Sequence, residues 1–192
     1  MCDILLITPP LTQLNTPYPA TSQLTGFLRS QGINAQQADL SIELIEVLFT
    51  KNMLTGIFEF TKDFKLSKQQ KIIQQQASFY IHNIEPVMRF ISGRDHTLAM
   101  RFSDLNFWPA SKRLPAEEDL EWAFGTIGNH DRATHLCTLF IRDIVDYINQ
   151  TIDPHFELIR YAESLCLRLP EFAPLQKELE KPFSLIDQLL ID

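Results

Sequence analysis

The stretch DILLITPP, residues 3–10, decides how the start of this chain folds. Its first six residues, 3–8, contain an apolar run from Ile4 to Ile7, and they lead directly into two prolines that cannot donate hydrogen bonds to a sheet ladder. A short apolar run of this kind is typical of a strand that is buried on both faces, as in a parallel sheet. We therefore predict a β-strand over residues 3–8.

An amphipathic helix is predicted over residues 21–31, where Gly32 follows as a stop signal. The apolar face of this helix consists of Leu24, Phe27 and Leu28. Residues 33–40 form a second predicted strand, because a strand, a helix and another strand in succession are most simply a βαβ unit. We expect Ser41 to cap the helix that follows.

Nearly all of the remaining sequence has helical spacing. Ser67 and Gln70 form a capping-box pattern ahead of an apolar stripe that continues to Gly93, and Pro86 should kink or break that helix. Further helices are predicted from Pro115 to about Gly125, from Asn129 with a wide apolar face, and from the pair Asp153 and Pro154.

The predicted fold is therefore mainly α with a small α/β part. Residues 1–50 form an incomplete, Rossmann-like βαβ unit with two parallel strands, and residues 51–192 form a helical bundle packed on it. Two parallel strands alone do not make a stable sheet. We expect the sheet to continue in strands beyond residue 192, so that the chain is a fragment or a truncated product with an exposed sheet edge.

Composition narrows the classes of function. The chain is 45% hydrophobic and 21% charged, as in ordinary globular proteins. Its net charge of −7 argues against a nucleic-acid partner, and it has neither a membrane-length apolar run nor a signal peptide, so a cytoplasmic location is expected. Three widely spaced cysteines predict neither a disulfide framework nor a metal site.

The loop after the first strand is the candidate binding site, because ligands of open α/β sheets bind at the carboxyl ends of the strands. No glycine-rich nucleotide motif is present. A solvated loop stiffened by proline, with Asp39 as a turn residue, is the simpler alternative. The candidate ligand-facing residues are Thr8, Pro9, Pro10, Thr12, Gln13, Asn15, Thr16, Tyr18 and Asp39.

Residues 3–10, 16–33 and 35–49 together resemble the amino-terminal region of radical S-adenosylmethionine proteins that carry a cobalamin-binding-type domain. Residues 131–165 resemble the helical segment between the second and third strands in one branch of that family. The resemblance implies that the loop after the first strand faces cobalamin. It also implies a downstream domain of the same protein as the partner of this chain.

Two departures from the family pattern limit this implication. The C-x-x-x-C-x-x-C signature is absent, so S-adenosylmethionine and a 4Fe-4S cluster are expected only in the downstream domain. The D-x-H-x-x-G motif of histidine-ligated cobalamin domains is absent as well. The implied function is an accessory amino-terminal region of a cobalamin-type radical S-adenosylmethionine enzyme. We assign no catalytic residue and no metal ligand in this chain.

Two other functions compete with this interpretation. One is a stand-alone helical protein-interaction module, with self-association through the exposed sheet edge as a related expectation. The other is a metal-dependent HD-type phosphohydrolase that uses His130 and Asp131. That chemistry needs a further histidine, such as His82 or His96, and a further aspartate, such as Asp146 or Asp153.

Overall fold

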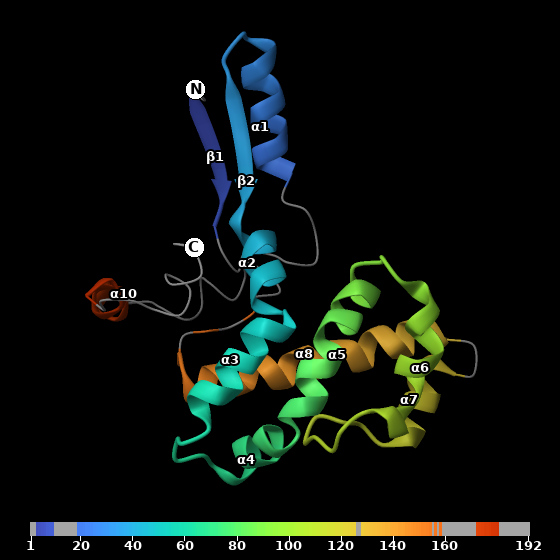
Figure 1. Cartoon of the computed structure of the whole chain (residues 1–192). Helices are drawn as coiled ribbons and strands as arrows, with labels where there is room; N and C mark the ends of the chain where they lie inside the picture. Colours follow the sequence, from blue (N-terminus) through green and yellow to red (C-terminus); the bar gives the residue numbers. More distant parts are fainter. Residues whose placement is uncertain are drawn as a thin grey trace. The chain divides into compact units, whose positions relative to one another are not determined.

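The computed structural model describes residues 3–9, 19–125, 128–154, 156, 158 and 172–180. These residues are mainly helical, with a small parallel sheet near the amino terminus, as the sequence predicts (Figure 1). The chain divides into two compact units, which we call the sheet unit (residues 1–48 and 157–192) and the helical unit (residues 49–156). In the described part of the chain, no helix has both the length and the apolar character needed to cross a membrane.

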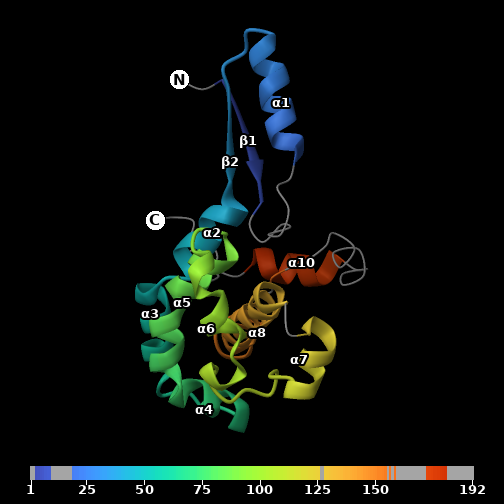
Figure 2. The ribbon, with the colours of Figure 1, turned by 90° about the vertical axis from the view of Figure 1, so that its right-hand side faces the viewer.

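The sheet unit contains the predicted βαβ arrangement. Strands β1 (Ile4–Thr8) and β2 (Ala35–Asp39) pair in parallel, and helix α1 (Pro19–Ser30) connects them and lies alongside the sheet in Figures 1 and 2. The helix stops as predicted at Gly32, whose φ of 79° favours glycine. The Arg29 Nε donates a 2.7 Å hydrogen bond to the carbonyl oxygen of Ala35, which ties the end of α1 to the start of β2.

The expectation that the first strand is buried on both faces is wrong. Leu5 is 53% exposed and Ile7 is also exposed. Successive side chains of a strand point to opposite faces, and the described elements of this unit leave one of those faces open. The predicted apolar face of α1 is also largely exposed, since Phe27 is 61% exposed and the buried residue of the helix is Thr25.

Two further helices belong to the sheet unit, α2 (Leu40–Leu48) and α10 (Phe172–Leu179). Helix α2 begins at Leu40, so Ser41 lies inside the helix and is not its cap. The backbone N–H groups of Ser41 and Ile42 both donate to Oδ1 of Asp39, at 3.1 and 3.2 Å. The carboxylate of Asp39 therefore caps the helix, because it can accept from two of the otherwise unpaired N–H groups in the first turn.

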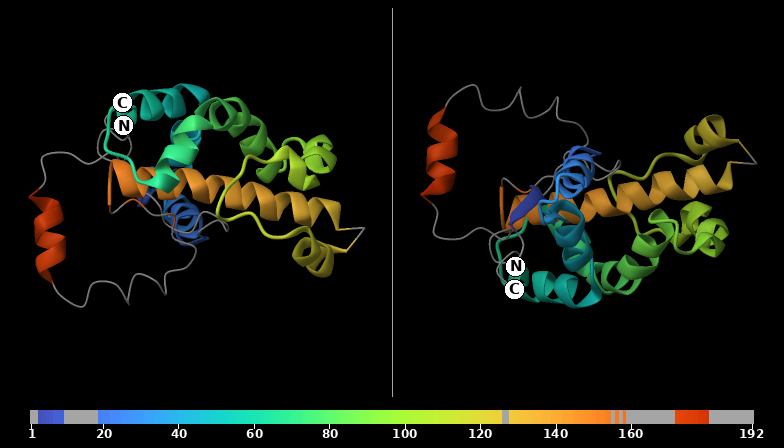
Figure 3. Two further views of the ribbon diagram at one scale, coloured as in Figure 1. Left: turned by 90° about the horizontal axis from the view of Figure 1, so that it is seen from below. Right: turned by 90° about the horizontal axis from the view of Figure 1, so that it is seen from above.

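The helical unit is built around one long helix. Helix α8 runs through the unit, with α5 on one side of it and α7 on the other (Figures 2 and 3). Its predicted apolar stripe is buried, as expected for a central helix. In chain order the elements of this unit are α3 (Lys51–Thr61), α4 (Lys68–Gln75), α5 (Ala77–Ile91), η1 (His96–Leu98), α6 (Ala99–Ser103), η2 (Leu105–Phe107), α7 (Glu117–Phe124) and α8 (Asn129–Thr151).

The capping box before α4 is present, with the side chains of Ser67 and Gln70 each accepting from the backbone of the other residue. The long helix predicted behind it is instead two helices, which separate at Gln76 with φ −97° and ψ 11°. Helix α5 continues through Pro86, so this proline does not break it. A proline in a helix removes only one backbone hydrogen bond. Here the turn that contains Pro86 is held against the core by Val87 and Phe90, which are both buried.

The helix ends at Gly93 and Gly125 are confirmed, and both glycines have positive φ angles. The predicted helix starts differ from the structure by one or two residues. Helix α7 begins at Glu117, so Pro115 precedes it, and Asn129 is the first residue of α8 instead of its cap.

The helix predicted from Asp153 and Pro154 is wrong for the residues that the structure describes. Phe156 and Leu158 are not helical, and the Phe156 N–H donates a 3.0 Å hydrogen bond to the carbonyl oxygen of Asp153. The remainder of that predicted helix lies outside the described residues.

Aromatic side chains fill the space between α5, α6 and α8. Trp108 is 7% exposed, its Nε1 donates to the carbonyl oxygen of Phe102 at 2.9 Å, and its ring centroid lies 5.4 Å from that of Phe140. Phe102 and Trp108 therefore both belong to the core of the helical unit. The second tryptophan, Trp122 on α7, is 90% exposed.

Candidate functional site

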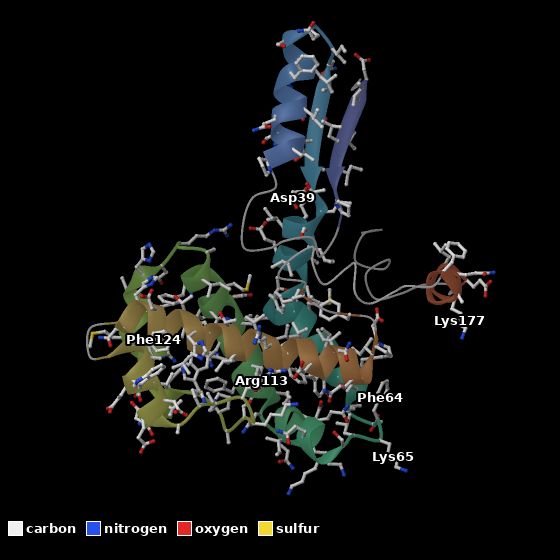
Figure 4. The ribbon with its side chains drawn as sticks, turned by 180° about the vertical axis from the view of Figure 1, so that it is seen from behind. Asp39, Phe64, Lys65, Arg113, Phe124 and Lys177 are labelled. Atoms are coloured by element: carbon white, nitrogen blue, oxygen red, sulfur yellow. The ribbon has the colours of Figure 1, made fainter. Side chains whose placement is uncertain are left out.

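The carboxyl end of the parallel sheet brings two of the predicted site residues together. Thr8 is the last residue of β1, Asp39 is the last residue of β2, and the two are partners in the strand register. Figure 4 labels Asp39 at this end of the sheet, where β2 passes into α2. Because ligands of open α/β sheets bind at the carboxyl ends of the strands, this pair marks the expected place.

Within the described residues, the hydroxyl of Thr8 has no hydrogen-bond partner. The Thr8 side chain is 3% exposed, and its Oγ1 is buried. A buried hydroxyl without a partner costs roughly 1–3 kcal/mol. A ligand group that donates to or accepts from Oγ1 would remove that cost.

Asp39 also caps helix α2 at this end of the sheet. Its Oδ1 accepts from the two N–H groups at the start of α2, so the carboxylate already occupies the positive end of that helix. An anionic ligand group is disfavoured there by the charge of the carboxylate. The pair therefore suits neutral hydroxyl or amide groups, which can donate to the carboxylate and exchange a hydrogen bond with Thr8.

The other predicted site residues are only partly placed. Pro9 follows β1 directly and is exposed. Those that lie outside the described residues are Pro10, Thr12, Gln13, Asn15, Thr16 and Tyr18.

A buried polar network in the helical unit was not predicted. Asp143 on α8 is 4% exposed, and its Oδ2 accepts a 3.1 Å hydrogen bond from the Tyr80 hydroxyl of α5. The Arg113 guanidinium, labelled in Figure 4, lies with Nε 3.6 Å from Oδ1 of Asp143, and it also donates from Nε to Oδ2 of Asp146 at 3.1 Å. One arginine thus holds the loop before α7 against two carboxylates of α8.

Burial controls the ionisation of this network. Desolvation raises the pKa of the Asp143 carboxyl, although hydrogen bonds from Ser111 and Tyr80 and the charge of Arg113 act in the opposite direction. The pKa of the Tyr80 hydroxyl is raised as well, first by burial and then by the nearby charge of Asp143. Tyr80 therefore remains a hydrogen-bond donor at neutral pH.

The cavity next to this network is very small. It has a volume of about 10 Å³ and lies between α4, the 110–112 loop and α8. This is enough space for one water molecule. Its polar lining residues include Gln70, Asp143, Asp146, Tyr147 and Gln150. The network thus has no room for an organic substrate, and we interpret it as structural.

A signal for this network exists in the sequence. Asp143 follows Phe140 by three residues and precedes Tyr147 by four, so it falls on the buried face of α8. A carboxylate on an apolar face requires partners, because a buried charge without them is costly. The spacing does not reveal that those partners are Tyr80 and Arg113, which come from other parts of the chain.

The predicted His130 and Asp131 dyad does not meet the needs of a phosphohydrolase centre. Asp131 is exposed, and its Oδ1 lies 3.9 Å from Nδ1 of His130. Asp146, one candidate for the additional aspartate, is paired with Arg113. Within the described residues, no group of three or more histidine, cysteine, aspartate or glutamate side chains could hold a metal ion.

The chain matches no protein-family model, no curated protein and no solved structure.

Proposed function

We propose that the sheet unit is the amino-terminal part of a cobalamin-binding-type domain, and that the chain is an accessory region of a radical S-adenosylmethionine enzyme. The observation that carries this proposal is the buried, unpartnered hydroxyl of Thr8 beside the carboxylate of Asp39 at the ends of two parallel strands, within the part of the chain that the structure describes. In this fold class that edge is where a cofactor binds.

The side chains at this edge suit the periphery of a corrin, which carries neutral carboxamide groups. A carboxamide can donate to the Asp39 carboxylate and can accept from, or donate to, the hydroxyl of Thr8. Bound cobalamin would supply a cobalt centre for alkyl-group transfer, while S-adenosylmethionine and the 4Fe-4S cluster belong to a further domain of the same protein. The residues of this chain would hold and orient the cofactor.

The proposed binding mode involves no cobalt ligand from the sheet unit. All five histidines of the chain lie between residues 82 and 155, which is within the helical unit. The affinity would therefore depend on hydrogen bonds and packing at the corrin edge, including those of Thr8 and Asp39.

A titration of the protein with hydroxocobalamin, followed by the corrin absorption bands, tests this proposal. Thr8→Val and Asp39→Asn should each weaken binding by about three- to tenfold, the effect of one lost hydrogen bond. Thr25→Val is the matched control, because Thr25 is a buried threonine of the same unit whose hydroxyl donates to the Thr21 carbonyl oxygen at 2.7 Å. Equal affinities for all four proteins, or no binding by any of them, would contradict the proposal.

A second candidate function is a stand-alone protein-interaction module that also associates with itself. It is favoured by exposed apolar side chains in both units, among them Leu5 and Ile7 on β1 and Trp122 on α7. In the described sheet β1 and β2 pair with one another, and association through a sheet edge is the form of assembly that this function would use. Light scattering after gel filtration distinguishes this function, since Ile7→Lys should convert a dimer into a monomer while leaving the helical content unchanged.

A further inference from the structure

Two histidines from distant parts of the sequence meet on the surface of the helical unit. His96 begins η1, and His130 lies in the first turn of α8. Their ring centroids are 5.5 Å apart, with an angle of 45° between the ring planes. Neither the proposed cofactor site nor the core of the helical unit uses these side chains.

Local structure fixes the backbone on both sides of this pair. Gly93, with φ 72°, ends α5 and reverses the chain, and the Arg94 N–H donates to the Arg89 carbonyl oxygen at 2.8 Å. Asp95 then caps η1 through a 3.1 Å hydrogen bond from the Thr97 N–H. These contacts direct His96 back over the end of α5.

The start of α8 is held equally firmly. Arg132 Nε donates a 2.7 Å hydrogen bond to the carbonyl oxygen of Ser103, which joins α8 to the end of α6. Behind the imidazole pair lies Phe90, a buried residue of α5 whose ring centroid is 5.1 Å from that of His130. The backbone near each histidine is therefore tied by hydrogen bonds, and the His130 ring contacts an apolar ring of the core.

The ring nitrogens of both histidines are available to a ligand. Both side chains are exposed, and within the described residues neither ring makes a hydrogen bond to the protein. The polar contact of His130 is the one to Asp131 at 3.9 Å, which is too long for a hydrogen bond. Imidazole nitrogens in this condition are ligands for zinc, copper and nickel.

The separation of the rings fits one shared metal ion. An ion bound about 2.1 Å from one nitrogen of each ring lies roughly 3.2 Å from each ring centre. The 5.5 Å between the centroids then corresponds to a nitrogen–metal–nitrogen angle of about 120°, close to the tetrahedral value. We propose that His96 and His130 form a two-histidine binding site for a divalent transition-metal ion such as Zn²⁺.

The surroundings define what kind of metal site this is. The carboxylates of Asp95 and Asp131 each neighbour one of the histidines in sequence and offset the charge of the ion. No third protein ligand is available from the described residues, so water completes the coordination. Such a site is open and exchangeable, in contrast to a structural zinc site with four protein ligands.

A zinc titration followed by the ring ¹⁵N resonances of the histidines tests the proposal on the wild-type chain. One nitrogen of His96 and one of His130 should shift together, with a single apparent Kd. His82 should not shift, because it is an exposed histidine of α5 without a second histidine in ring contact among the described residues. A shift confined to one histidine, or independent affinities for His96 and His130, would overturn the proposal.

Three variants sharpen the test in a common Cys2→Ser background, which removes a competing thiol. His96→Ala and His130→Ala should each weaken Zn²⁺ binding by about tenfold or more and abolish the shift of the remaining partner, whereas His82→Ala should change neither. Circular dichroism verifies that each variant is folded. If either single variant retains the wild-type affinity, the shared site does not exist.

Discussion

The hydroxyl of Tyr80 donates a 3.1 Å hydrogen bond to Oδ2 of Asp143, and both side chains are buried in the core of the helical unit. The bond joins α5 to α8 across 63 positions of sequence. Burial alone would make a carboxylate costly at this place. The Asp143 carboxylate is stabilised by two neighbours. The Tyr80 hydroxyl donates to it, and the Arg113 guanidinium lies close to it while donating to Asp146.

Replacing Tyr80 by phenylalanine removes one donor and leaves the ring, whose centroid lies 4.9 Å from that of Phe140. We expect the free energy of unfolding to fall by about 1–3 kcal/mol, because the Asp143 carboxylate loses a buried partner. Urea unfolding followed by circular dichroism measures this change.

Tyr147→Phe is the matched control for this substitution. The Tyr147 hydroxyl is also buried against polar groups, at 2.6 Å from Oγ1 of Thr61, but its partners are uncharged. Loss of the Tyr147 hydroxyl should therefore lower the free energy of unfolding by less, about 0.5–1.5 kcal/mol. The account of Asp143 fails if Tyr80→Phe is no more destabilising than Tyr147→Phe.

Stability should depend on pH through Asp143. Burial raises the pKa of this carboxyl above its ordinary value of 3.8, so the folded protein holds the proton more tightly than the unfolded chain does. The contribution of Asp143 is therefore complete below pH 3.8 and is lost as the pH rises through the raised pKa. An asparagine side chain cannot titrate, so the stability advantage of the wild type over Asp143→Asn should shrink with increasing pH. An advantage that grows instead would mean that the charge of Arg113 outweighs desolvation.

Arg113 should matter more than its neighbour Lys112. Arg113→Ala leaves Asp143 and Asp146 without their shared partner, and we expect a loss of about 1–3 kcal/mol. Lys112 is half exposed, with Nζ 3.8 Å from Oδ2 of Asp146, so Lys112→Ala should cost less than about 1 kcal/mol. Similar effects of the two substitutions in urea unfolding would show that the arginine has no special role.

The cap of α2 can be tested separately from ligand binding. Asp39→Ala removes the acceptor of two backbone N–H groups and should destabilise the sheet unit by about 1 kcal/mol. Asp39→Ser retains a capping oxygen, so it should lower the stability of the sheet unit by only a few tenths of a kcal/mol. Hydrogen exchange at the amides of Ser41 and Ile42 measures both effects directly. Equal protection in the alanine and serine variants would show that Asp39 does not cap the helix.

The elements that could be predicted from the sequence are those that local chemistry specifies. Glycines with positive φ angles end helices at Gly32, Gly93 and Gly125, where a side chain would be strained. The capping box of Ser67 and Gln70 starts α4 through contacts three residues apart. The parallel pairing of the two strands follows from the helix between them, because a hairpin turn could not connect strands in this direction.

The features that could not be predicted depend on contacts between distant residues. Tertiary packing decides that α5 continues through Pro86 and that the helices separate at Gln76 instead. The helical spacing predicts an apolar stripe on α1 that includes Phe27. The spacing alone does not predict how much of this stripe other elements cover, and Phe27 is in fact exposed. For the candidate site, the sequence predicted that Thr8 and Asp39 lie near the ends of the two strands, whereas their pairing in the strand register and the capping role of Asp39 needed the structure.

The two tryptophans of the chain differ in surroundings so strongly that each reports on a different property. Trp108 is enclosed by aromatic rings near Phe102 and Phe140, so its fluorescence should be blue-shifted and insensitive to acrylamide until the helical unit unfolds. Trp122 is exposed on α7. Its emission should therefore be red-shifted and quenched by acrylamide in the native state, and a partner that covers that helix should shift the emission to the blue and protect it from acrylamide. A Trp122→Phe variant therefore gives a single intrinsic probe that follows the folding of the helical unit alone.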